Sequence, residues 1–173
     1  MNGVRLLSNG RYRVLITAAG AGCSALGDIL LTRWSADPTR EAEGWFLYLK
    51  DLDTGRLWSA GHQPVQREAD SYRVEAWPDS VSITREDKGL ELITRIAVDP
   101  ASNSEWRRHT LTNRSVARRR IQLTSCIEVV LDDPAAAAGH PAFSKLFVQT
   151  EYLPETQALL ARRRPRSPDQ PAV

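Results

Sequence analysis

The sequence has 173 residues, 42% of them hydrophobic, and its 23 Lys and Arg against 21 Asp and Glu give a net charge of +2. This length fits one domain that can bury a core, and the balanced charge argues against a nucleic-acid partner, which needs clustered basic residues. No apolar stretch approaches twenty residues, so we expect no direct membrane insertion.

The first strong pattern is a period of two over residues 11–18, typical of a half-buried strand. One face of it carries three large side chains, Tyr12, Val14 and Ile16. The small residues 20–22 follow, and they let the chain reverse or pass close to another surface. A second extended run occupies residues 28–34. The sequence therefore predicts two strands joined by a small-residue turn.

Extended runs with turn residues between them continue at roughly ten-residue spacing, which favours an antiparallel sandwich. They cover residues 44–52, 56–59, 72–77, 80–86, 90–98, 106–113, 119–131 and 144–152. We expect Leu90, Leu92, Thr94, Ile96 and Val98 to share a face. Residues 135–138 could form a loop or a single helical turn. We predict a sandwich domain over 1–153, one short helix over about 154–163, and a Pro-rich disordered tail up to residue 173.

Collinear motifs spread over most of the chain carry a resemblance to a known family. They are Asn9-Gly10-Arg11-Tyr12, Ala19-Gly20-Ala21-Gly22-Cys23-Ser24, Thr32-Arg33-Trp34, Asp37-Pro38-Thr39-Arg40, Trp58-Ser59, EWRRHTLTNRS over 105–115, TSCIEVVL over 124–131 and HPAFSKLFVQTE over 140–151. Together they resemble the amino-terminal sandwich domain of glycoside hydrolase family 94, the inverting glycoside phosphorylases. The similarity is greatest to the phosphorylase-like region of bacterial cyclic β-1,2-glucan synthases.

The resemblance implies an all-β, antiparallel super-sandwich of the galactose-mutarotase-like type, incomplete at its carboxyl-terminal end. It also implies a parent enzyme that acts on β-1,2-glucan by inverting phosphorolysis or chain-length control, with inorganic phosphate as co-substrate and no other cofactor. The family's catalytic aspartate lies in a helical barrel far downstream, so we expect no catalytic residue here. One departure is Cys23, where the family usually has an aromatic residue, which puts sugar stacking at that position in doubt.

Four residues are candidates for sugar contact. Trp34 and Trp58 border turns and could be partly open, and an indole face matches the apolar face of a pyranose ring. Arg33 could serve a sugar hydroxyl, phosphate or a partner's carboxylate, or it could form a strand-end salt bridge. Ser24 belongs to the glycine-containing turn. Trp45 and Trp106 lie on strand patterns and are expected in the core.

Other chemistry finds little support in the sequence. His62, His109 and His140 lack neighbours at metal-ligand spacing, so we expect no metal site. A catalytic pair of carboxylates could in principle come from five acidic residues, but the sequence does not give the distance between their carboxyl groups. Asp51 and Asp53 of this set look like turn formers. The set is Asp28, Asp37, Asp51, Asp53 and Glu128. The basic runs 118–120 and 162–164 are expected to be solvated. Cys23 and Cys126 lie far apart, which favours a reducing compartment and hence the cytoplasm, with any inner-membrane tether supplied by segments outside this chain.

We therefore expect the non-catalytic sandwich portion of a carbohydrate-active enzyme, with roles in scaffolding, dimerisation and sugar contact. Its expected partners are a β-glucan oligosaccharide, the helical barrel of the parent, and a second copy that pairs with uncovered strand edges. Two alternatives remain open. A free-standing carbohydrate-binding module predicts an exposed aromatic platform, and a purely structural assembly domain predicts that Trp34 and Trp58 are buried.

Overall fold

The computed structural model describes residues 3–34 and 43–165, so the Asp37 motif and the tail beyond Pro165 lie outside the described residues. Within these ranges the strands form antiparallel sheets, and the predicted all-β class is confirmed. The N-terminal sheet has the order β1-β2-β3-β4-β12. Its strands are β1 (Val4–Ser8), β2 (Tyr12–Thr17), β3 (Gly22–Leu26), β4 (Ile29–Thr32) and β12 (Val129–Asp132).

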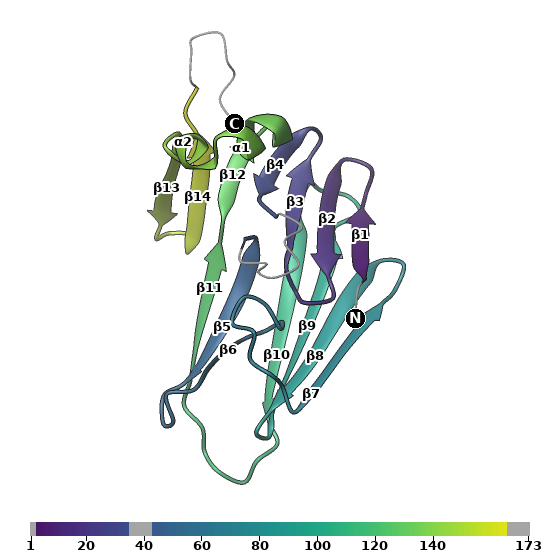
Figure 1. Ribbon diagram of the computed structural model, residues 1–173, viewed down its shortest axis with the longest axis vertical. Coiled ribbons are helices and arrows are strands. Elements are labelled where there is room, and N and C mark those ends of the chain that lie inside the picture. Colours follow the sequence, from purple (N-terminus) through teal and green to yellow (C-terminus); the bar gives the residue numbers. More distant parts are fainter. Residues whose placement is uncertain (1–2, 35–42, 166–173) are drawn as a thin grey trace.

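The long sheet has the order β10-β9-β8-β7 and forms one layer of the sandwich. Its strands are β7 (Ser71–Ala76), β8 (Ser80–Asp87), β9 (Leu90–Val98) and β10 (Glu105–Asn113). The small sheet has the order β11-β5-β6, from β5 (Trp45–Asp51), β6 (Leu57–Ser59) and β11 (Ile121–Ile127). A hairpin of β13 (Val148–Leu153) and β14 (Ala158–Arg163) lies beside two short helices, α1 (Pro134–Gly139) and α2 (Pro141–Lys145), at the top of Figure 1.

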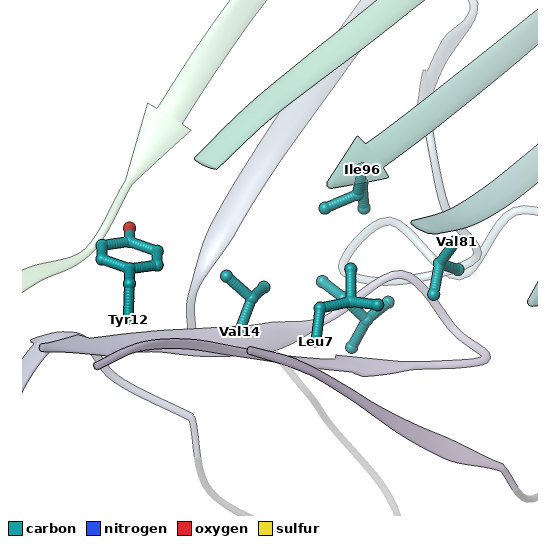
Figure 2. Packing of buried hydrophobic residues seen from close by; sticks show 6 residues of the cluster. Leu7, Tyr12, Val14, Val81 and Ile96 are labelled. Atoms are coloured by element: carbon teal, nitrogen blue, oxygen red, sulfur yellow. The ribbon is translucent and has the colours of Figure 1, made fainter. Parts of the chain in front are cut away.

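The N-terminal sheet packs on one end of the long sheet. Leu7, Tyr12 and Val14 rise from β1 and β2 toward Val81 and Ile96 of the long sheet (Figure 2). Val14 and Val81 are fully buried. The predicted period of two over residues 11–18 is therefore confirmed, and each such side chain contributes about 1.5–3 kcal/mol by leaving water.

The small sheet packs on the other end of the same long sheet. Leu49 of β5 and Trp58 of β6 meet Leu90 and Leu92 of β9 in a second core cluster. The predicted face of β9 is confirmed, because its alternate residues from Leu90 to Ile96 are buried and Val98 packs against the first cluster. The inward face of the long sheet thus serves two cores in succession.

Three sequence predictions need correction. The run 28–34 does not follow directly on the small-residue turn, because Gly22–Leu26 forms β3 and pairs with β2. The predicted run 119–131 is two strands, since β11 pairs with β5 whereas β12 pairs with β4. The expected strand over 144–152 begins at Val148, because Pro141–Lys145 is helical, with proline in its first turn.

The predicted helix over residues 154–163 is wrong, and the helical content is two short helices elsewhere. Ala158–Arg163 is strand β14, which pairs with β13 along its whole length. Gln157 adopts a left-handed φ of 52°, and this turn returns the chain onto β13. Residues 135–138 lie in α1, whose first amides bond the Asp133 side chain. Neither helix, nor any other in the described ranges, is long and apolar enough to cross a membrane.

Candidate functional site

The turn between β2 and β3 passes against a second loop, as its small residues predicted. A Cβ on Gly20 would lie 2.8 Å from the Gly61 Cα, and one on Gly61 would lie 2.5 Å from the Ala19 carbonyl oxygen. The Gln63 amide also donates to the Ala19 carbonyl at 2.9 Å. Glycine at both positions therefore lets two backbones touch, and the turn is held from behind by residues 61–63.

Ser24, the first candidate residue, lies in a buried polar cluster rather than on a surface. Its side chain is 2% exposed, and its hydroxyl donates to Glu105 Oε1 at 2.8 Å. The other Glu105 oxygen lies 3.5 Å from Arg107 Nη2. Arg107 stacks over the Trp45 ring at 4.6 Å and donates to the Trp45 carbonyl. Ser24 therefore joins the N-terminal sheet to β10 and, through Arg107, to β5.

Burial, with the charges of the Glu105–Arg107 pair as the second cause, shifts the pKa of three neighbouring groups. Burial, followed by the Glu105 charge, raises the pKa of the Tyr12 hydroxyl and of the Cys23 thiol. Burial, followed by the Arg107 charge, lowers the pKa of His109. All three groups are thereby favoured in their neutral forms at neutral pH, so Cys23 is a poor nucleophile.

Arg33 and Trp34 lie at the end of β4, beside α1. Arg33 is 9% exposed and donates to the Ala137 carbonyl at 3.0 Å. It also forms an ion pair with Glu43 at 3.8 Å, so the strand-end salt bridge considered for it is present. Trp34 is half-buried, and its indole Nε1 is buried without a hydrogen-bond partner among the described residues.

The tryptophans differ from expectation in two places. Trp58 is 2% exposed and packs in the second core, so the prediction that it is partly open is wrong. Strand β6 has three residues, which is too short for an alternation in the sequence to reveal this burial. Trp106, expected in the core, is 41% exposed because it lies on the outer face of β10, where Arg108 stacks on it. Trp45 is half-buried under Arg107.

Most acids considered for catalysis instead hold basic side chains. Asp53 pairs with Arg120 and Glu128 with Lys145, each at 2.6 Å, whereas Asp28 is exposed in the β3–β4 turn. Asp51 is buried, and its carboxylate accepts from the Asp53 and Thr54 amides, as a turn former does. Asp37 lies outside the described residues. The basic runs are not fully solvated, because Arg119 pairs with Asp51 and Arg163 with Asp132.

The side chain of His109 makes a structural contact. His109 Nδ1 lies 3.0 Å from the Thr94 hydroxyl, and His140 precedes α2. In the ranges 3–34 and 43–165, no three His, Cys, Asp or Glu side chains come together as metal ligands.

Stability should depend on pH through Asp51. Hydrogen bonds from Arg119, opposed by burial and aided by the two turn amides, lower the pKa of Asp51 from 3.8 to about 2. A depressed folded-state pKa stabilises the fold above the unfolded value of 3.8, and this contribution disappears as pH falls through about 2. We expect Asp51→Asn to cost about 1.5–3 kcal/mol at neutral pH. Urea unfolding at a series of pH values should show this cost shrinking between those two pKa values.

The matched control for this prediction is Asp28→Asn, which makes the same change at an exposed turn position. Its unfolding free energy should stay within about 0.5 kcal/mol of the parent chain across the pH series. A cost for Asp51→Asn that stays constant down to the lowest pH would contradict the assignment.

Comparisons with known proteins place this arrangement in context. The family model of the glycosyl hydrolase 94 supersandwich domain matches residues 1–173. The chain is similar to the cyclic beta-(1,2)-glucan synthase NdvB of Rhizobium meliloti (strain 1021), with 33% identity over 168 residues, which is 97% of this chain and 6% of that protein. It is also similar to solabiose phosphorylase of Paenibacillus borealis, with 27% identity over 118 residues, 67% of this chain and 15% of that protein. The chain therefore spans a small part of either relative.

Proposed function

Because this chain belongs to the glycosyl hydrolase 94 supersandwich family, we propose that it is the non-catalytic sandwich portion of a carbohydrate-active enzyme. The proposed parent acts on β-1,2-glucan by inverting phosphorolysis or chain-length control, with inorganic phosphate as co-substrate. The role of this portion is to scaffold the helical barrel that carries the chemistry, to support dimerisation and to contact sugar.

One observation carries the non-catalytic role, which is that four buried carboxylates are each paired with an arginine. The pairs are Asp51–Arg119, Asp87–Arg85, Glu105–Arg107 and Asp132–Arg163, with N–O distances of 2.5, 2.6, 3.5 and 2.7 Å. A general acid for glycoside cleavage needs a raised pKa. Arginine instead holds each of these carboxylates in a structural ion pair, and for Asp51 the hydrogen bonds from Arg119 lower the pKa.

Burial and internal contacts reduce the number of residues that could contact a sugar. Ser24, Arg33 and Trp58 are buried and engaged inside the protein, so we propose that they hold the surrounding structure in place. Trp34 keeps part of its side chain exposed and follows β4 of the N-terminal sheet, so it remains the proposed sugar contact. This distribution favours a scaffold over a binding module, which would present a broad aromatic platform.

Self-association is part of the proposal because the sheets are open and have edge strands. Among the described strands, β11 pairs only with β5 and β10 only with β9. Leu123 and Ile127 of β11 are 51% and 44% exposed, although they lie across from Leu49 and Trp45 on the core-facing side. Free backbone groups next to exposed apolar side chains favour pairing with another strand, which a second copy can supply.

A calorimetric titration of the chain with linear and cyclic β-1,2-glucan, with light scattering on the same sample, tests the proposal. We expect binding weaker than millimolar together with a dimer or larger species, because the apolar edges and not an open sugar site dominate the exposed features. Micromolar binding by a monomer would contradict the scaffold role and would identify a free-standing glucan-binding module.

Two variants make this titration specific. Trp34→Ala should remove any residual affinity, whereas Trp77→Ala is the matched control because Trp77 is 47% exposed at the β7–β8 turn, on another sheet. Equal loss of affinity in both variants would contradict a contact at Trp34. The free thiols of Cys23 and Cys126 accord with the proposed cytoplasmic location, which cell fractionation of the parent can test.

A further inference from the structure

A small cavity lies where the N-terminal, small and long sheets meet, between the two core clusters. Its volume is about 20 Å³. Its walls include Gly20 and Gly61, Trp45 at the start of β5, and the inward face of β9 and β10. Four polar residues line it: Gln63, Thr94, Arg107 and His109.

Two buried polar atoms of these lining residues have no hydrogen-bond partner among the described residues. One is the acceptor Gln63 Oε1, and the other is the donor Arg107 Nε. Gln63 is 7% exposed, and so is the Arg107 side chain. An unsatisfied buried donor or acceptor is costly, and native structures leave few of them. Because Gln63 and Arg107 line the same small space, one ligand that both accepts and donates could satisfy both atoms.

We propose that this cavity holds one ordered water molecule, which accepts a hydrogen bond from Arg107 Nε and donates one to Gln63 Oε1. A single water needs about 10–15 Å³ of such volume, so the cavity has room for one water and not for a sugar ring. The pair formed by the Thr94 hydroxyl and His109 Nδ1, 3.0 Å apart, gives the water a further polar wall. Burial lowers the pKa of His109, which keeps a second positive charge away from Arg107.

The water has a structural consequence for the turn between β2 and β3. Gln63 already bonds the Ala19 carbonyl through its backbone amide. Through the water its side chain also reaches Arg107, which holds Glu105 and thereby Ser24. The water site therefore links the loop of residues 61–63, which contacts the β2–β3 turn, to the buried Glu105–Arg107 ion pair.

Gln63→Met tests the proposal, since methionine has a similar length and cannot accept strongly. In a hydrated cavity the water loses a partner, and the urea midpoint should fall. In a dry cavity the substitution removes an unsatisfied oxygen, and the midpoint should rise or stay unchanged, which would overturn the proposal. Gln122→Met is the control, because Gln122 is exposed on β11.

Water magnetic relaxation dispersion gives a second measurement that does not depend on the direction of the stability change. The unsubstituted chain and Gln122→Met should show the same number of long-lived internal waters, and Gln63→Met should show one fewer. An equal number in all three proteins would overturn the proposal. Should Gln63→Met fail to fold, a high-resolution crystal structure of the parent chain decides between a water peak in contact with both atoms and a cavity without density.

Discussion

Gly22→Ala is expected to leave most molecules unfolded under conditions in which the unsubstituted chain is fully folded. A Cβ on Gly22 would lie 1.8 Å from the Leu15 carbonyl oxygen and 2.8 Å from its carbon, and both are backbone atoms. Gly22 pairs with Ile16 in the β2–β3 ladder, so relief of the overlap must break that pairing. We expect a loss of more than about 4 kcal/mol, a large share of the usual stability of a domain.

Gly27→Ala is the matched control for this substitution. Gly27 also has a left-handed φ, of 54°, but a Cβ there would meet nothing within 4 Å. Its cost should be limited to the conformational term of about 1–2 kcal/mol. Urea unfolding followed by tryptophan fluorescence compares the two. Equal destabilisation by both substitutions would mean that backbone conformation, and not the close contact with Leu15, requires the glycine.

Arg85→Met is expected to cost about 3–5 kcal/mol, because it leaves a buried carboxylate without its partner. Arg85 is 1% exposed and bonds both oxygens of Asp87, at 2.6 and 3.0 Å. It also donates to the carbonyls of Gly61 and Arg67, so the loop behind the β2–β3 turn depends on it as well. Unfolding in urea measures the loss directly.

Two further variants separate the ion pair from general effects of losing an arginine. Arg73→Met removes a solvent-exposed partner of Glu75, and its effect should stay within about 0.5 kcal/mol. The double variant Arg85→Met with Asp87→Leu removes both charges, so it should recover much of the loss. A double variant as unstable as Arg85→Met would place the cost in the carbonyl contacts instead.

The strands with clear alternation could be predicted from sequence. The β7–β8 hairpin follows from two extended runs that flank a turn at Pro78 and Asp79. The inward face of β9 follows from period two, because its alternate residues from Leu90 to Val98 are mostly large and apolar. The sequence does not predict β3, because Gly22–Leu26 reads GCSAL, which has no β-branched or aromatic residue. The sequence of β14 favours a helix, because Pro154 and two leucines suit one, and only its pairing with β13 makes it a strand.

The candidate site was less predictable, since its links join residues far apart in sequence. Glu105 and Arg107 alternate on one strand, and this spacing could have indicated a buried pair on the face next to Ile96. No local pattern could reveal that Ser24 bonds Glu105, or that Arg119 reaches Asp51. The sequence does not predict the burial of Trp58, because a tryptophan beside a turn can face either solvent or core and its three-residue strand is too short to show an alternation.

The N-terminal sheet takes its fifth strand from β12, which pairs with β4 after the chain has passed through the small sheet and the long sheet. During synthesis β1 to β4 leave the ribosome early, but their sheet acquires this last neighbour only when residues 129–132 emerge. The N-terminal sheet is therefore completed by a late, long-range contact, and such contacts slow folding because a large loop must close first. Until β12 arrives, the nascent chain exposes the outer edge of β4.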